Sequence, residues 1–293
     1  MEGFYKSIDQ TLKEYGRGIA GGLLFSLPML YTMELWWTGF LAAPLHLLIY
    51  LAVGIFLLMM YSHYVGLSSD TSLLACFTEA LEELGLGIVV SVIILYITGR
   101  IVPEMPYSEI IGKVVVESVT VAIGISIGKA QLSDNNNSDK QEESDEEDSG
   151  KLEDLNPNQR KRYLVRSINL ALCGSLIVAA NVAPTEEVVL IALESAPFKL
   201  MLIAITSLAI GAAILYHINF KGSQDDILHR DSITEIIAGT AIMYALALIT
   251  SAFMLWFFGR FDNLSLPGII AETVVLGFPA ILGASAGRLL IQD

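Results

Sequence analysis

The chain has 293 residues, of which 54% are hydrophobic and only 16% are charged, and its formal net charge is −14. Soluble domains carry about 25% charged residues, so this composition is typical of a polytopic membrane protein. The acidic balance and the lack of a basic stripe exclude a nucleic-acid-binding function. The two distant cysteines, Cys76 and Cys173, exclude a disulfide scaffold and a four-cysteine zinc site. No cleaved signal peptide is expected.

Eight apolar segments approach the length of roughly 20 residues that a helix needs to cross the hydrocarbon of a bilayer. Lipid offers no partners to backbone N–H and C=O groups, so these segments are expected to be helices rather than strands. The predicted fold class is therefore all-α, a polytopic membrane protein with about eight transmembrane helices. The segments are approximately residues 18–39, 44–64, 84–101, 107–130, 163–183, 197–219, 233–259 and 266–290.

A strongly acidic segment separates the fourth and fifth apolar segments. Ten acidic residues and two lysines lie between Asp134 and Asp154, and large apolar side chains are almost absent. Such a segment cannot bury enough apolar surface to offset the entropy of ordering, so it is predicted to be a disordered linker. The predicted organisation is a four-helix membrane repeat over 1–130, the acidic linker over 131–159 and a second four-helix membrane repeat over 160–293.

The distribution of Lys and Arg predicts the orientation, because basic residues gather on the cytoplasmic side of a membrane protein. With eight spans, the N-terminal segment, both flanks of the linker, the connection after residue 219 and the C-terminal end fall on one side. That side is predicted to be cytoplasmic, together with both termini. The opposite side keeps only Arg100, Lys199 and Arg260.

An internal repeat spans the apolar parts of the chain. Residues 32–46 read TMELWWTGFLAAPLH and residues 185–199 read TEEVVLIALESAPFK, so Thr-x-Glu and Ala-Pro recur at an offset of 153. Further matches follow in the same order, including Gly99-Arg100 with Gly259-Arg260. Four spans in each half would make the halves parallel repeats, related by a pseudo-twofold axis along the membrane normal, with a site expected at their interface.

Two Thr-x-Glu sequences form the main candidate site. Thr32 with Glu34, and Thr185 with Glu187, supply the hard oxygen ligands that suit Ca²⁺, Mg²⁺, Na⁺ or a proton. A carboxylate near the membrane is costly unless it faces protein or water, so Glu34 and Glu187 are candidate paired cation ligands and the tentative metal site.

The same residues have a purely structural interpretation that is left open. Prolines before and after segments 32–42 and 185–195 predict that each is a short separate helix. Thr and Glu at the start of a short helix can cap its unpaired N–H groups, and capping would explain both Thr-x-Glu sequences without a function.

A second group of charged residues is expected deeper in the membrane. Glu117 lies in the middle of segment 107–130, and Lys113 is one turn away, where the two side chains could pair. Glu272 occupies the position that corresponds to Lys113 in the second half, which predicts a contact between Lys113 and Glu272. Structural pairing is favoured, and a relay role in ion transport is the alternative.

An acidic layer is expected near the cytoplasmic ends of the third and seventh spans. Acids in the first turn of a helix favour its dipole, which explains most of them without a function. An inner carboxylate ring would also suit a cation path, and His63 and His217 lie at a similar depth, where they could titrate near neutral pH. The acidic residues are Glu79, Glu82, Glu83, Asp231 and Glu235.

Two Gly-x-Ser-x-Gly sequences could suggest a serine nucleophile at Ser126 or Ser285. A nucleophile elbow needs a strand–turn–helix context, whereas both sequences lie inside predicted helices. Helix packing through close glycine contacts is therefore favoured. With no further catalytic motif in the chain, it is not expected to be an enzyme. The packing residues are Gly124, Gly128, Gly283 and Gly287.

The sequence GRGIAGGLLFSLPMLYTMELWWTG at residues 16–39 resembles the opening of an uncharacterised bacterial family of integral membrane proteins. The resemblance implies a multi-pass protein of the bacterial inner (plasma) membrane and implies nothing about a substrate. NVAPTEEV at 181–188 is similar to the helix breaks of cation/Ca²⁺ exchangers. The halves expected here are parallel rather than inverted, so no exchanger residue is carried over.

Two functions of different classes follow from the sequence. The first is a cation-translocating protein, either a secondary transporter or an ion channel, with the bilayer and an inorganic cation as partners and no cofactor beyond a bound cation. The alternative is a membrane scaffold or sensor whose acidic cytoplasmic linker binds a partner or divalent ions. The identity of the ion, the coupling mechanism and the formation of a homo-oligomer are left open.

Overall fold

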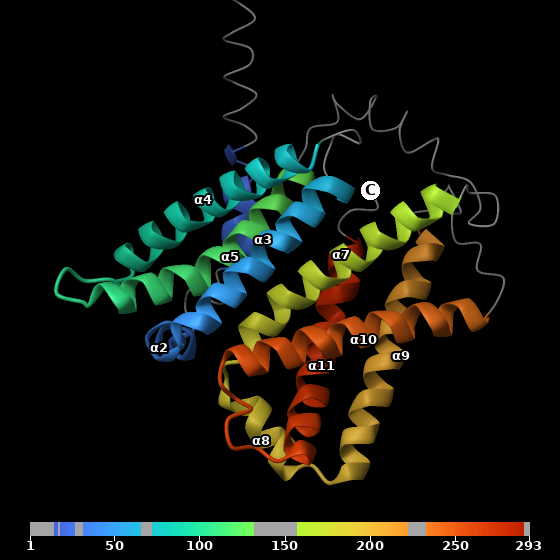
Figure 1. The fold of residues 1–293 in the computed structure, drawn as a ribbon. Helices are drawn as coiled ribbons and strands as arrows, with labels where there is room; N and C mark the ends of the chain where they lie inside the picture. Colours follow the sequence, from blue (N-terminus) through green and yellow to red (C-terminus); the bar gives the residue numbers. More distant parts are fainter. Residues whose placement is uncertain are drawn as a thin grey trace, which may run out of the picture. The chain divides into compact units, whose positions relative to one another are not determined.

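The computed structural model describes residues 15–16, 18–26, 32–65, 72–131, 157–221 and 233–289. Within these ranges every regular element is a helix (Figure 1), which confirms the all-α prediction. The chain divides into two compact units, Met1–Ser138 and Asp139–Asp293. The division falls inside the segment predicted as a linker, most of which lies outside the described residues. Each unit is described separately.

The first unit is built around one central helix. Besides the helical segment 18–26 it contains α2 (Met33–Leu41), α3 (Pro44–Val65), α4 (Leu73–Ile97) and α5 (Tyr107–Gln131). Helix α5 packs against α2, α3 and α4, and its glycines also contact segment 18–26. Every described residue from Gly112 to Gly128 except Val115 is buried, so α5 forms the core of the unit.

The second unit also has one helix that contacts all the others. Its elements are α7 (Pro157–Val182), α8 (Glu186–Glu194), α9 (Pro197–Lys221), α10 (Ile233–Phe257) and α11 (Leu266–Leu289). Helix α11 packs against α7, α8, α9 and α10. It contains Pro279 in its interior, where the ring removes one backbone donor from the helix.

Prolines set the boundaries of the short helices. Pro44 is the first residue of α3 and Pro197 is the first residue of α9, a position where the missing N–H is not needed. The nine-residue helices α2 and α8 end just before these prolines. The sequence prediction of two short helices at 32–42 and 185–195 is confirmed.

Helices α4 and α10 end in the same way. Gly99 and Gly259 both have φ of +71°, a left-handed conformation that glycine adopts without strain. The amides of Arg100 and Arg260 then bond back to the carbonyls of residues 95 and 255, at 2.7 and 2.9 Å. This hydrogen-bond pattern is a Schellman motif, and it returns the chain toward α5 and α11 respectively.

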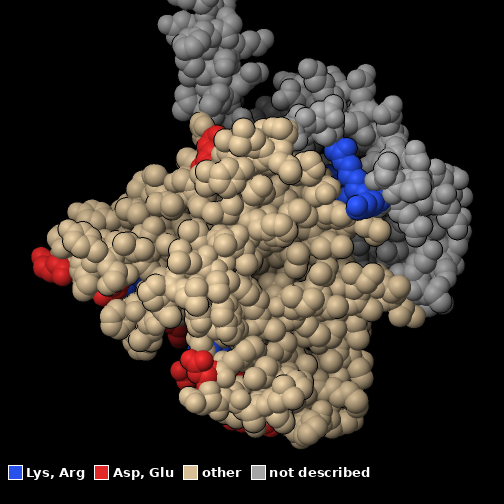
Figure 2. Space-filling model, viewed as in Figure 1, with Lys and Arg blue, Asp and Glu red and all other residues tan. Residues whose placement is uncertain are grey.

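Seven described helices are long and apolar enough to cross a membrane: Pro44–Tyr64, Leu73–Ile97, Tyr107–Lys129, Leu164–Val182, Pro197–Ile214, Ile237–Phe257 and Leu266–Gly287. Large apolar side chains such as Phe56, Ile205 and Ile249 are more than half exposed. Figure 2 shows that uncharged residues make up most of the visible surface. A surface of this kind needs apolar surroundings, and lipid supplies them.

The structure changes three of the predicted boundaries. Segment 18–39 contains two helices, at 18–26 and in α2, so the prediction of eight spans is not established. Helix α4 begins at Leu73 rather than at residue 84, so the acidic residues expected before this span lie inside the helix. Helices α5 and α7 extend into both ends of the predicted linker, to Gln131 and from Pro157.

Candidate functional site

Helix α5 carries polar side chains through the apolar interior of the first unit. Lys113, Glu117, Thr120 and Ser126 are each at most 7% exposed. Burial of such groups costs free energy unless a partner compensates it, and the cost is largest for charges. The polar contacts of α5 therefore show which of these groups are satisfied inside the unit.

Lys113 is satisfied near the start of α5. Its ammonium lies 2.6 Å from the carboxylate of Glu109 and donates to the Arg100 carbonyl at 3.2 Å. The Arg100 guanidinium in turn lies 4.0 Å from the ring centroid of Trp36. Lys113 pairs with Glu109 rather than with Glu117, the partner that the sequence suggested, because a Glu that precedes Lys by four residues is the better orientation.

Glu117 has no such partner. Its side chain is 1% exposed, and neither carboxylate oxygen has a hydrogen-bond partner among the residues that the structure describes. It lies one residue from the midpoint of the candidate span Tyr107–Lys129. The sequence also placed Glu117 in the middle of a predicted span, and the pairing with Lys113 that its spacing allowed is not formed.

Three neighbouring helices enclose Glu117. Gly39 of α2 lies against the backbone of Lys113, Gly54 of α3 against Val119 and Gly87 of α4 against the Ser118 carbonyl. These contacts bring the helix backbones close to α5 on either side of Glu117. From α3, Tyr50 interacts with Thr120 and with Glu117, and its side chain is fully buried.

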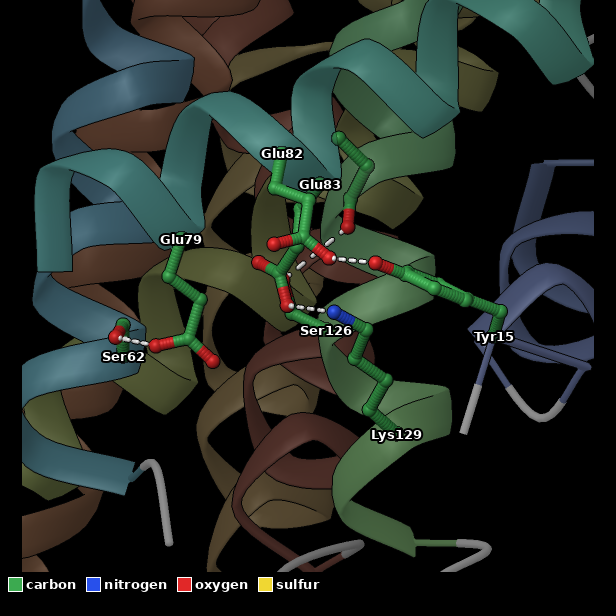
Figure 3. A network of polar contacts seen from close by, with 8 residues as sticks. Tyr15, Ser62, Glu79, Glu82, Glu83, Ser126 and Lys129 are labelled. Atoms are coloured by element: carbon green, nitrogen blue, oxygen red, sulfur yellow. Dashed lines mark hydrogen bonds and ion pairs between the residues drawn. The ribbon is translucent and has the colours of Figure 1, made fainter. Parts of the chain in front are cut away.

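Toward the end of α5, three carboxylates of α4 form a second polar group, named here the α4 carboxylate cluster (Glu79, Glu82 and Glu83). Each has a different partner from another part of the first unit (Figure 3). Ser62 of α3 donates to Glu79, and the Tyr15 hydroxyl donates to Glu82 at 2.5 Å. The cluster therefore joins α3, α4 and the residues before α2.

Glu83 is the buried member of the α4 carboxylate cluster and is held by α5. The Ser126 hydroxyl donates to one carboxylate oxygen at 2.5 Å, and the Lys129 ammonium lies 3.5 Å from the other. The Glu83 side chain is 5% exposed, so this ion pair is largely shielded from solvent. Lys129 also lies 5.7 Å from the ring centroid of Tyr15.

The helix-dipole explanation is wrong for the α4 carboxylate cluster. Because α4 begins at Leu73, its first turn contains no acidic residue, and the three glutamates lie further along the helix with side-chain partners. His63 lies in the last turn of α3, and its Nδ1 is 3.8 Å from the Sγ of Cys76 in α4. Asp231 and the side chains of Glu235 and His217 lie outside the described residues.

The two Thr-x-Glu sequences begin the short helices. Thr32 and Thr185 occupy the N-cap positions of α2 and α8, but neither side chain makes a capping hydrogen bond. The Thr185 hydroxyl donates instead to the Val182 carbonyl at 2.8 Å. Glu34 is half-buried and Glu187 is exposed. The capping interpretation therefore lacks its threonine hydrogen bonds.

A paired site of Glu34 and Glu187 would join the two units, and it stays a prediction. Within the described residues, no group of three or more His, Cys, Asp or Glu side chains is placed to hold a metal ion. The predicted contact between Lys113 and Glu272 also joins the two units and also stays a prediction.

The second unit places its own charges near the corresponding turn. Glu272 is 2% exposed and interacts electrostatically with Arg260. The Arg260 guanidinium donates to the Pro184 carbonyl, just before the N-cap of α8. Lys113 and Glu272 thus each have an oppositely charged neighbour in their own unit.

The glycines of both Gly-x-Ser-x-Gly sequences lie at close helix contacts. A Cβ on Gly21 would lie 2.4 Å from Gly128, and one on Gly174 would lie 2.1 Å from the carbonyl oxygen of Gly283. The intervening serines differ, since Ser126 bonds to Glu83, whereas the buried hydroxyl of Ser285 has no partner among the described residues.

Sequence reasoning missed the partners rather than the acids. Ser126 was interpreted as part of a packing motif, and Lys129 only as an orientation signal. The spacing of three residues between them, one turn of α5, is a signal that could have paired them with a facing carboxylate. Tyr15 and Ser62 carry no comparable signal, because nothing in their own segments points to α4.

Searches of curated proteins and of solved structures found no match to this chain. A family model of integral membrane proteins, DUF2391, matches residues 14–291. The match covers nearly the whole chain, including every helix described above, and it confirms the family resemblance of residues 16–39. The chain therefore belongs to the DUF2391 family of integral membrane proteins.

Proposed function

We propose that this protein moves a cation across the membrane, and that the cation passes along α5 of the first unit. The observation that carries the proposal is Glu117, an acid at the middle of a candidate span with no partner for either oxygen within the described residues. A buried carboxylate in a membrane is costly, and acids retained at such positions typically mark ion or proton pathways.

The other charged residues of α5 support the proposal. The Lys113–Glu109 pair lies near one end of the span, and the Lys129–Glu83 pair lies near the other. Glu117 lies between the two ion pairs, and no partner among the described residues compensates its charge. A cation that binds at Glu117 would supply the compensation that the ion pairs supply at either end.

The distribution of basic residues supports an orientation for this path. Lys129 belongs to the side that is rich in Lys and Arg, so the end of α5 at the α4 carboxylate cluster would face the cytoplasm. Arg100 and the Lys113–Glu109 pair would then lie on the outer side. The membrane would be the inner (plasma) membrane of a bacterium, as the family resemblance implies.

We infer that the two units are copies of one repeat, which supports a transporter-like architecture. Helices α2 and α8 have nine residues each, and α5 and α11 have 25 and 24. Both units contain the same left-handed glycine turn and the same close glycine contacts on their central helix. Parallel repeats of this kind are found among transporters, with binding sites near the middle of the membrane.

The copies differ in the residues of the proposed path. The offset that aligns Gly124 with Gly283 places Leu276 at the position that corresponds to Glu117, and Leu276 is fully buried. The offset that aligns Glu79 with Glu235 places Gly239 at the position that corresponds to Glu83. The second unit therefore lacks both acids, and this difference favours a path through the first unit.

An enzymatic function is not proposed. The Ser126 hydroxyl donates to Glu83, and that carboxylate is held in a buried ion pair with Lys129. Ser285 is buried without a hydrogen-bond partner among the described residues, whereas a nucleophile needs an adjacent base. Both serines are better explained by their positions between packed glycines.

Ion flux in liposomes tests the proposal. Purified protein is reconstituted, and uptake of H⁺, Na⁺, K⁺, Mg²⁺ and Ca²⁺ is measured for the natural chain, Glu117→Gln and Glu104→Gln. Glu104 is exposed in the connection between α4 and α5, so its variant is the control. Flux of one cation that is lost in Glu117→Gln and kept in Glu104→Gln supports the proposal. Equal flux in both variants, or no flux of any of these ions, refutes it.

The outer Thr-x-Glu residues are tested separately. If Glu34 and Glu187 form a paired entry site, Glu34→Gln and Glu187→Gln should each reduce the flux, and the double variant should reduce it no further than the stronger single one. Additive losses, or natural flux in the double variant, would remove the paired site while leaving the path along α5 in place.

A further inference from the structure

We infer that Glu117 is a proton-binding site, and that the cation moved by the protein is H⁺. The second part rests on the proposed function. The first part rests on the geometry around Glu117 alone, and it can be tested without any measurement of transport.

The charge balance around Glu117 favours a bound proton. Both oxygens lack a hydrogen-bond partner among the described residues, and the nearest basic side chain along α5, Lys113, is engaged by Glu109. An ionised carboxylate in this position would be buried without hydrogen bonds and without a counter-charge, which is the costliest arrangement for an acid. One bound proton removes the charge and needs no additional space.

The surroundings of Glu117 suit a proton better than a metal ion. Ca²⁺ takes about six to eight oxygen ligands, and Mg²⁺ needs near-octahedral coordination. Within the described residues, no group of three or more His, Cys, Asp or Glu side chains is placed to hold a metal ion, and Tyr50 of α3, which interacts with Glu117, also interacts with Thr120. The Thr120 hydroxyl is directed to the Val116 carbonyl, at 3.5 Å. Few oxygens remain for a metal ion, whereas a proton needs only the carboxylate.

The helices packed against α5 also carry titratable groups. On α4, Glu79, Glu82 and Glu83 are bound to Ser62, Tyr15 and Ser126. Ser126 is nine residues from Glu117, or about 14 Å along the helix axis. On α2 the acid is Glu34, which is half-buried.

On α3, Tyr50 is the titratable side chain that interacts with Glu117. His46, Tyr61, His63 and Tyr64 lie on the same helix. The described part of segment 18–26 contains no titratable side chain. Neither oxygen of Glu117 has a hydrogen-bond partner within the described residues, so its burial disfavours the ionised carboxylate.

Carbodiimide labelling tests this inference directly. Dicyclohexylcarbodiimide is apolar and reacts with protonated carboxyl groups in membranes. The carboxyl proton moves to a carbodiimide nitrogen and the carboxyl oxygen adds to the central carbon. The adduct then rearranges to a stable N-acylurea without a leaving group. Membranes containing the full chain are treated near neutral pH, and the modified residue is identified by mass spectrometry of peptides.

The variants are chosen to separate Glu117 from other acids. Labelling of the natural chain should occur at Glu117, disappear in Glu117→Gln and persist in Glu104→Gln, whose altered residue is exposed in the connection between α4 and α5. It should also weaken as the pH is raised, because the ionised carboxylate does not react. Glu117→Asp keeps a carboxyl group and should still be labelled if it folds, which separates loss of the site from loss of structure.

The other outcomes overturn the inference. Absence of label at Glu117 in the folded natural chain would show that the site does not hold a proton. Protection by Na⁺, Mg²⁺ or Ca²⁺ at constant pH would show that a metal ion and not a proton occupies it. Labelling at Glu117 in a protein that moves no protons would leave the proton site in place and refute only the proposed function.

Discussion

At the scale of single residues, the two central helices use the same serine differently. Ser126 of α5 donates to Glu83, whereas the hydroxyl of Ser285 in α11 is buried without a partner within the described part of the second unit. A hydrogen bond to a buried charge contributes more than one between neutral groups. The pair of serines therefore provides an experiment with its own control.

Ser126→Ala should destabilise the protein, because it removes a hydroxyl that satisfies a buried carboxylate, at a cost of about 2 kcal/mol. Ser285→Ala should have little effect or should stabilise slightly, since it removes an unpaired polar group. Thermal unfolding of both variants in detergent checks the difference. Equal melting temperatures for the two variants would contradict the assigned role of Ser126.

Lys129 and Glu83 should behave as a coupled pair. Lys129→Met leaves a buried carboxylate without its counter-ion, and such a loss typically costs about 3–5 kcal/mol. Adding Glu83→Gln removes the uncompensated charge and should restore part of the stability. Melting temperatures of the two single variants and the double variant form a thermodynamic cycle. A double variant less stable than Lys129→Met would show that the ion pair is not what holds α4 to α5.

The sequence located the acids better than their partners. The depth of Glu117 followed from its position in an apolar segment, and the grouping of Glu79, Glu82 and Glu83 followed from their spacing. Their partners could not be predicted, because Tyr15, Ser62 and Ser126 lie in other helices and hydrogen bonds between helices leave no periodic signal. The helix-dipole interpretation failed because it depended on where α4 begins, and helix starts are poorly determined by apolar periodicity alone.

At the scale of helices, close glycine contacts hold the first unit around α5. A Cβ added to Gly112 would lie 1.7 Å from the carbonyl oxygen of Gly39, whereas one added to Gly85 of α4 would meet nothing within 4 Å. Helices in lipid associate largely through such close packing, since lipid supplies no hydrophobic drive between them. The contact of α2 with α5 therefore depends on residue size at Gly112.

Gly112→Ala should push α2 away from α5 and destabilise the first unit by about 3 kcal/mol, the upper end of ordinary overpacking. Gly85→Ala meets no neighbour and should gain up to about 1 kcal/mol from the higher helix propensity of alanine. Melting temperatures of the two variants should thus change in opposite directions. A harmless Gly112→Ala would show that α2 and α5 are not in contact at this point.

Element boundaries were predicted well where proline or glycine marks them. The starts of α3 and α9 coincide with Pro44 and Pro197, and the ends of α2 and α8 follow from the same residues. Segment 18–39 was counted as one span because its mean apolar character is continuous, although its prolines already predicted a separate short helix at 32–42. Hydropathy does not register a division into two helices, so the number of spans could not be settled from composition.

At the scale of the whole molecule, the proposed path and the acidic linker support two different candidate functions. The cation path uses residues of α3, α4 and α5, whereas the scaffold or sensor alternative depends on the acidic segment. Composition and the family match establish a multi-pass membrane protein. The internal repeat stays a prediction from glycine, proline and acid positions that recur in order. The alignment of the two halves places no acid opposite Glu117 or Glu83.

Deletion of residues 133–156 should leave ion flux in liposomes unchanged, because none of the residues of the proposed path lies in this segment. The measurement compares the shortened and natural chains at equal amounts of folded, reconstituted protein, as judged by gel filtration. Loss of flux on deletion, with the fold retained, would contradict this prediction and would require a role for the acidic segment in the path itself.

Proton flux in liposomes that contain the Glu117→Gln or the Glu117→Asp variant decides whether Glu117 carries protons across the membrane. Liposomes containing the protein and a trapped pH-sensitive dye are given a potassium diffusion potential, and the change of internal pH is followed. We expect proton uptake by the natural chain and none by Glu117→Gln. Glu117→Asp should show reduced uptake, because its carboxyl group is retained but shifted. Proton uptake by a folded Glu117→Gln protein at the natural rate would contradict this role of Glu117.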